Sequence, residues 1–152
     1  EARVVGRGAL ALIWPKGKVE ELEILRRTKI KPGHFKLLTK ETMPARFHYS
    51  KHRRIPPLVF LADEGWYLET DLKDLLKPKV FGLHGYDNSL KDMQAVFLAS
   101  GPRVPKNRKV GEVQNIDIYS LLAQLLKIKP AKNEGHLERI LKVLDIKPES
   151  FN

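Results

Sequence analysis

The stretch Gly8-Ala9-Leu10-Ala11-Leu12-Ile13-Trp14 is a continuous apolar run that ends at Pro15-Lys16-Gly17, a pattern typical of a buried strand followed by a turn. Apolar side chains then recur among charged ones over residues 19–27, with acidic residues early and basic residues late, which predicts an amphipathic helix. Pro32-Gly33 ends this helix, and residues 34–38 are predicted to form a second strand. A strand, a helix and a strand within about 30 residues make a small α/β unit.

Apolar runs further along the chain predict more strands. Residues 41–57 contain three prolines and a basic run, and we interpret them as a connector. Residues 57–62 are strongly apolar, and the turn residues 63–65 followed by the aromatic start of residues 66–68 predict a returning strand and therefore a hairpin. Residues 94–99 form another apolar run, which predicts a further buried strand.

Two helices are predicted after these strands. The first carries apolar residues on one face between residues 118 and 126 and ends near Pro130, and Asn115 or Asp117 can cap it. The second spans about residues 136–144, and its inward face is expected to consist of Leu137, Ile140, Leu141 and Leu144. Alternating strands and helices predict the α/β fold class, with a domain boundary within residues 44–56.

Composition narrows the class of protein. The chain has 152 residues, of which 42% are hydrophobic, and this fits one globular domain or parts of two. It has no cysteine, which excludes disulfides and thiolate metal sites, and no apolar run reaches the roughly 18–20 residues that span a bilayer. Because the first residue is not Met and no signal-peptide pattern follows it, we expect a mature form, a proteolytic product or an expressed segment.

The net charge of +10 raises nucleic acid as a partner. Binding of that kind needs cations clustered on one face, and single-stranded nucleic acid also needs aromatic side chains for base stacking. Lys and Arg are instead spread along the chain, and the densest basic runs, 51–54 and 103–109, contain no aromatic residues. We therefore expect a solvated basic surface and do not favour nucleic acid as the partner.

His84 is the sharpest candidate for chemistry. It lies in the loop Gly82-Leu83-His84-Gly85-Tyr86-Asp87-Asn88, directly after the apolar pair Val80-Phe81. The glycines allow a tight turn that would expose the imidazole at the end of a strand, where α/β proteins place their sites. A neutral imidazole is a good zinc ligand, and Asp87 can orient it or a neighbouring ligand. On spacing alone, a single histidine in such a loop is more often a turn residue than a ligand.

Other polar residues have structural interpretations. His48 and His52 have the spacing of a helical metal pair, but prolines on either side disfavour a helix there, so we do not expect a metal site. The remaining assignments are His34 on a strand, His136 at the start of the last helix, Tyr86 and Asn88 as residues that shape the loop or contact groups around a metal, and Thr28, Thr39, Thr42 and Thr70 as surface or capping residues.

The loop and its surroundings resemble a known family. Residues 82–88, followed by residues 93–102 (Met-Gln-Ala-Val-Phe-Leu-Ala-Ser-Gly-Pro), closely resemble the C-terminal region of the nucleotide pyrophosphatase/phosphodiesterase family of the alkaline phosphatase superfamily. Further stretches that resemble this family are residues 43–49, 54–66, 114–119 and 130–135.

This resemblance implies an alkaline-phosphatase-like α/β core. Residues 53–152 would form the C-terminal part of that core, and residues 1–52 would form a small α/β segment of its cap insertion. It also implies a phosphodiesterase with two zinc ions and a threonine nucleophile, in which His84 is a zinc ligand.

The other zinc ligands and the nucleophile segment of the family are not found in this sequence. Since a catalytic zinc ion needs about three protein ligands, we expect no catalytic residue here and no activity of this chain alone. Its expected partners are the N-terminal remainder of the catalytic domain and a phosphodiester substrate of nucleotide or phospholipid type, in a periplasmic or extracellular location. Two alternatives stay open: a non-catalytic interaction domain derived from the family, and a basic nucleic-acid-binding module.

Overall fold

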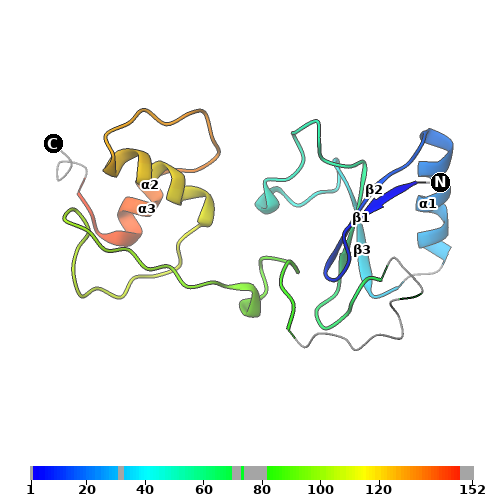
Figure 1. The fold of residues 1–152 in the computed structure, drawn as a ribbon, viewed down its shortest axis with the longest axis horizontal. Helices are drawn as coiled ribbons and strands as arrows, with labels where there is room; N and C mark the ends of the chain where they lie inside the picture. Colours follow the sequence, from blue (N-terminus) through cyan, green and yellow to red (C-terminus); the bar gives the residue numbers. More distant parts are fainter. Residues whose placement is uncertain (1, 31–32, 70–72, 74–81, 148–152) are drawn as a thin grey trace. The chain divides into compact units, whose positions relative to one another are not determined.

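The computed structural model describes residues 2–30, 33–69, 73 and 82–147, which belong to two compact units, residues 1–94 and 95–152. Figure 1 shows strands and a helix in the first unit and a helix pair in the second. The first unit contains, in chain order, β1 Arg3–Val5, β2 Leu10–Trp14, α1 Lys18–Ile30, β3 Phe35–Thr39, the short 3-10 helix η1 Ala45–Phe47, β4 Leu58–Ala62 and the 3-10 helix η3 Lys91–Met93. The second contains the 3-10 helix η4 Asn115–Asp117, α2 Ile118–Leu125 and α3 Leu137–Leu144.

The strands form one antiparallel sheet in the order β1-β2-β4-β3. Since β4 pairs antiparallel with both β2 and β3, the latter two run parallel to each other, and α1 connects them across β4. This is a split β-α-β unit. The predicted strand, helix and strand are confirmed, and so is the α/β class, but β2 and β3 are not neighbours.

The connector after β3 covers one face of the sheet. On that face Val59 stands opposite Leu12 in β2 and Leu38 in β3. The connector adds the apolar side chains that close this cluster, namely those of Met43, Phe47 and Tyr49. Burial of this apolar face is the main force that holds η1 and the connector against the sheet.

The predicted hairpin is wrong. The chain turns where expected, with the amide of Trp66 donating to the Asp63 carbonyl at 3.0 Å. However, Leu68 then pairs with Gly8 in an isolated bridge, through backbone hydrogen bonds of 2.9 and 2.8 Å. The physical reason is that both edges of β4 already carry a strand, so the returning chain pairs with the segment between β1 and β2 instead.

The predicted buried strand over residues 94–99 is also wrong. These residues carry no strand hydrogen bonds, and Val96 and Leu98 are 85% and 89% exposed. Phe97, between them, packs against the apolar cluster of the second unit. This sequence of an exposed, a packed and an exposed side chain has the two-residue period of a strand. Within the described residues, however, no neighbouring strand pairs with residues 94–99.

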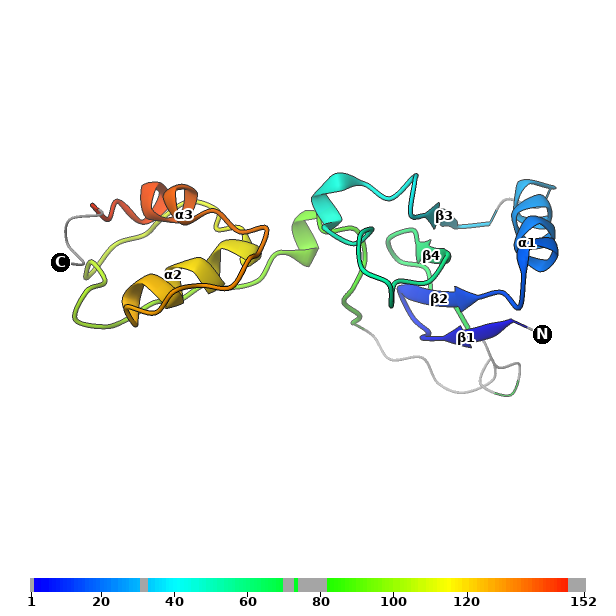
Figure 2. The ribbon, with the colours of Figure 1, turned by 90° about the horizontal axis from the view of Figure 1, so that it is seen from above.

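Helix α1 agrees with the sequence in its charges but not fully in its packing. Glu20 and Glu21 occupy its first turn, and Arg27 and Lys29 its last, as the helix dipole favours. Its apolar face is only partly buried, and Val19 on this face is 84% exposed. Both ribbon views place α1 beside the sheet (Figures 1 and 2).

The second unit is organised by α2 and α3, which lie side by side (Figure 2). Its core consists of Leu121, Ile140, Leu141, Leu144 and Ile146. The inward face predicted for α3 is confirmed. For α2 the prediction is partly wrong, because the side chains of Leu122 and Leu126 are exposed. The helix ends at Leu125, before the predicted stop near residue 130, and Lys127 then adopts a left-handed conformation with φ of 56°.

Asp117 connects the two helices of this unit. It precedes α2, as predicted for a cap, but its side chain makes no capping hydrogen bond to that helix. Its buried carboxylate instead accepts hydrogen bonds from the His136 amide at 2.8 Å and from Arg139 at 2.6 and 2.7 Å. A carboxylate at this position complements the dipole of α3, so Asp117 caps α3.

The boundary predicted within residues 44–56 falls between β3 and β4, which are hydrogen-bonded neighbours. The compact units divide after residue 94 instead. The assignment of residues 1–52 to a cap and of residues 53–152 to a core stays a prediction. None of the helices in the described part of the chain has the length and apolar character that crossing a bilayer requires.

Candidate functional site

The loop of residues 82–88 lies against the start of β2. Gly82 and Gly85 have φ of 112° and 91°, which β-carbon-bearing residues rarely adopt, so glycine is required at both turns. A β-carbon placed on Gly85 would lie 3.9 Å from the side chain of Ala9. His84 lies between these glycines with its side chain exposed. The preceding pair Val80-Phe81, on which the predicted strand end depends, is outside the described residues.

Asp87 ties this loop to the rest of the first unit. Its carboxylate accepts a hydrogen bond from Arg46 at 2.5 Å and lies 4.0 Å from the ammonium group of Lys36. It also accepts hydrogen bonds from the amide and the hydroxyl of Ser89, at 2.9 and 2.7 Å. The guanidinium of Arg46 and then the Ser89 donors lower the pKa of Asp87 far below its usual range, although partial burial opposes them.

These contacts differ from one of the two roles predicted for Asp87, the orientation of His84, while the orientation of a neighbouring ligand stays a prediction. Within the described residues, none of its hydrogen bonds reaches His84, so this carboxylate anchors the loop and does not orient the imidazole. Arg46 is a residue that the sequence interpretation missed as part of the site. The signal that pointed toward it was the family resemblance of residues 43–49.

Tyr86 and Asn88 shape the loop. The hydroxyl of Tyr86 donates to the carbonyl of Trp66 at 2.8 Å, and the amide group of Asn88 donates to the carbonyl of Arg46 at 3.4 Å. The loop also borders a cavity of about 230 Å³ above the sheet. This cavity is lined by Leu10, Leu38, Met43, Phe47, Tyr49, Val59, Leu61, Gly85, Tyr86 and Asn88.

The donor set fits only part of a zinc site. Within the described residues, no three His, Cys, Asp or Glu side chains come close enough together to hold a metal ion. An exposed imidazole on a glycine-bounded loop fits one ligand position, and a zinc ion needs further protein ligands. His84 therefore suits a site to which other residues contribute.

The other histidines keep structural roles. His48 follows η1 in a left-handed conformation with φ of 49°, so it shares no helix with His52, as predicted. The prediction that His34 lies on a strand is wrong by one residue, because it lies in a bend just before β3, where its ring stacks on Trp66 with centroids 3.5 Å apart. His136 immediately precedes α3, as predicted.

The threonines that the structure describes make local hydrogen bonds. Thr28 donates to main-chain carbonyls of its own helix, and Thr39 and Thr42 hydrogen-bond each other across the turn after β3. Thr70 lies outside the described residues. Thr42 is at the surface as predicted, whereas Thr28 is half-buried within α1 and is neither a surface nor a capping residue.

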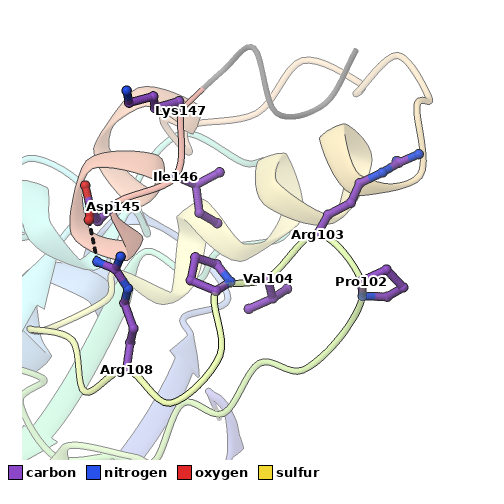
Figure 3. Close-up of a pocket in the computed structure, with 8 residues that line it drawn as sticks. Pro102, Arg103, Val104, Arg108, Asp145, Ile146 and Lys147 are labelled. Carbon is purple, nitrogen blue, oxygen red and sulfur yellow. Dashed lines mark hydrogen bonds and ion pairs between the residues drawn. The ribbon is translucent and has the colours of Figure 1, made fainter.

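A second hollow, of about 500 Å³, lies in the second unit (Figure 3). It contains none of the residues that the sequence singled out for chemistry. Figure 3 shows Arg108 directed at Asp145, with which it forms an ion pair. Arg103 donates to the Leu125 carbonyl at the end of α2, at 2.8 Å. Because both guanidinium groups bind groups within the protein, we interpret them as contacts that hold the segment of residues 102–108 in place. They do not define an anion site.

Comparison with known proteins shows the family. The model of the type I phosphodiesterase/nucleotide pyrophosphatase family matches residues 2–87, which include the sheet, Arg46, His84 and Asp87. The chain belongs to this family. Through this family it is a member of the alkaline phosphatase superfamily, and its relatives are hydrolases.

Relatives from this family match most of the chain. Bovine bis(5'-adenosyl)-triphosphatase is 37% identical over 126 residues, which is 83% of this chain and 26% of that protein. Human ectonucleotide pyrophosphatase/phosphodiesterase family member 5 is 35% identical over 144 residues, or 93% of this chain and 29% of that protein. The chain thus spans less than a third of the length of either relative.

Solved structures of the family confirm the fold. Human ectonucleotide pyrophosphatase/phosphodiesterase 5 matches with a TM-score of 0.78 and 30% identity, over 95% of this chain and 37% of that one. An inactive threonine-to-alanine variant of the murine protein in complex with AMP matches with a TM-score of 0.79 and 31% identity, over 94% and 37% of the two chains. The match is consistent with an alkaline-phosphatase-like fold.

Proposed function

We propose that this chain supplies the His84 loop to the active site of a zinc-dependent phosphodiesterase or nucleotide pyrophosphatase. The observation that carries the proposal is the position of His84. It is exposed on a loop whose two glycine turns and whose Asp87 anchor hold it beside the sheet, and the family match extends through that loop.

His84 would occupy one ligand position of the zinc site through a ring nitrogen. Zinc, when bound, polarises phosphoryl oxygens and lowers the pKa of a coordinated nucleophile. The remaining ligands and a threonine nucleophile would come from an N-terminal remainder of the catalytic domain. On this proposal we expect no activity of the chain by itself, since its described residues bring no three metal-binding side chains together.

The substrates that we propose are small phosphodiesters. The names of the relatives favour nucleotides, because one is a bis(5'-adenosyl)-triphosphatase and another was solved with AMP. Phosphodiester lipids stay open, and we propose a periplasmic or extracellular location. A basic surface without an aromatic stacking platform gives no support to nucleic acid as the partner.

The experiment begins with the reading frame around this chain. The product of the complete frame is purified and assayed with bis(p-nitrophenyl) phosphate and with dinucleoside polyphosphates, and its zinc content is measured. We expect His84→Ala to lower zinc content and hydrolysis together, because a lost ligand affects both. The matched control is His52→Ala, which removes another exposed histidine of the same unit. Unchanged zinc content and full activity in His84→Ala would contradict the proposal.

A second candidate function is a non-catalytic interaction domain derived from the family. The incomplete ligand set of the described residues favours it. A complete reading frame that lacks the family's nucleophile and its Asp and His ligands, together with a product that binds no zinc, would select this alternative.

A further inference from the structure

Arg46 contacts the His84 loop through both its side chain and its main chain. Its guanidinium donates to Asp87 at 2.5 Å, and its carbonyl accepts from the side chain of Asn88 at 3.4 Å. These partners are 41 and 42 residues away in sequence. One residue therefore holds two consecutive residues of the loop that carries His84.

Arg46 lies on a short helix that packs against the sheet. It is the middle residue of η1. In this helix the amide of Phe47 donates to the Pro44 carbonyl and the amide of His48 to the Ala45 carbonyl, each at 3.0 Å. Phe47 packs onto the apolar face of the sheet, and the guanidinium carbon of Arg46 lies 4.7 Å from the centre of the Phe47 ring. A cation over an aromatic face is attracted by the ring quadrupole, which further restricts the arginine side chain.

The loop needs such an anchor. Residues 82–90 form no helix or strand, so no regular hydrogen-bond ladder determines their path. Gly82 and Gly85 also widen the range of conformations that the backbone can adopt. The position of His84 then depends on the side-chain contacts that follow it, and the strongest of these is the charge-assisted bond between Arg46 and the mostly buried carboxylate of Asp87.

We propose that Arg46 is a positioning residue, which holds Asp87 and Asn88 and thereby sets the place of His84 relative to the sheet. Its relevance to catalysis rests on the proposed function. Lys36 is a poor substitute, because its ammonium group lies 4.0 Å from Asp87 and it lacks the planar fork of donors that fits a carboxylate.

The first test uses the 152-residue chain and measures amide hydrogen exchange over residues 82–90. We expect exchange about tenfold faster in Arg46→Met, since loss of one strong side-chain contact opens a loop with little other support. Exchange in β2 and β4 should stay unchanged. Arg26→Met is the matched control, because it removes a two-bond ion pair with Glu23 on α1 and should leave the loop as it is. Equal loop exchange in Arg46→Met and in the unaltered chain would overturn the proposal.

A second set of variants separates the contact from a general folding defect. Arg46→Lys keeps the charge without the fork, and we expect exchange between that of Arg46→Met and that of the unaltered chain. Asp87→Asn removes the charge from the other side and should match Arg46→Met, because both break the same bond. This pair still decides the question if Arg46→Met does not fold. Exchange in Asp87→Asn equal to that of the unaltered chain would also overturn the proposal.

The functional measurement uses the product of the complete reading frame. There Arg46→Met should lower kcat and zinc content with little change in KM, because it displaces His84 without touching a substrate contact, and Arg46→Lys should restore part of both. A kcat and zinc content equal to those of the unaltered protein would refute the role in positioning the metal ligand. The two proposals fail separately: full activity and zinc in His84→Ala defeats the proposed function, whereas unchanged loop exchange in Arg46→Met defeats only this inference.

Discussion

Replacement of Asp117 by Asn tests the electrostatic link between α2 and α3. The carboxylate is buried and accepts three hydrogen bonds, two from Arg139 and one from the His136 amide. Asn keeps the size but loses the charge and one acceptor oxygen. Loss of one partner from a buried ion pair costs about 3–5 kcal/mol, but the Arg139 side chain is 44% exposed and regains water. We therefore expect a loss of about 2 kcal/mol in the free energy of unfolding of the second unit.

The assay is urea unfolding of the second unit, followed by hydrogen exchange of the amides in α2 and α3. The matched control is Asp145→Asn, because Asp145 is also paired with an arginine in this unit but its side chain is 74% exposed. Asn also tolerates the left-handed conformation found there, and an exposed pair contributes about 0–1 kcal/mol. Equal effects of the two substitutions would refute the assignment of Asp117 as the buried link.

The same carboxylate predicts how the stability of the second unit depends on pH. Hydrogen bonds from Arg139, followed in effect by that from the His136 amide, lower the pKa of Asp117 in the folded state, while burial opposes them. Its contribution is therefore complete above the unfolded-state pKa of about 4 and is lost as the pH falls through the lower folded-state pKa. Asp117→Asn should remove this part of the acid dependence.

Two further substitutions test the packing. Gly135→Ala would place a β-carbon 2.1 Å from the Ile116 carbonyl oxygen, so we expect a loss of about 2 kcal/mol or more, whereas Gly111→Ala meets nothing within 4 Å and should be nearly neutral. Leu58→Ala removes a fully buried side chain of β4 and should lower the free energy of unfolding of the first unit by about 2–5 kcal/mol. Leu122→Ala is the control, because it removes an exposed leucine in the second unit. Thermal unfolding is measured for each of the four variants. Similar losses for each substitution and its control would contradict the packing described.

Local patterns in the sequence were sufficient to predict most of the helices and strands. The apolar run of residues 8–14 predicted β2, and the alternation of apolar and charged residues predicted α1 and α3. These patterns suffice because the period of a helix or a strand is a property of consecutive residues. The loop motif likewise marked His84 and the family, since its glycines and histidine are close together in sequence.

Tertiary structure alone decided what each element pairs with. Residues 66–68 have the composition of a strand, yet only Leu68 pairs, and its partner is Gly8 because both edges of β4 already carry a strand. Residues 94–99 have the alternation of a strand, yet no described strand binds them. Strand pairing depends on residues that are distant in sequence, so composition shows the capacity for a strand but not its partner.

The same distinction applies to the candidate site. The sequence by itself determined that His84 lies in a glycine-bounded loop of a phosphodiesterase family. Only the fold showed that Asp87 binds Arg46, 41 residues earlier, and that Asp117 caps α3 and not α2. The physical reason is that charges and hydrogen bonds act through space, and the distances that matter to them arise only when the chain has folded.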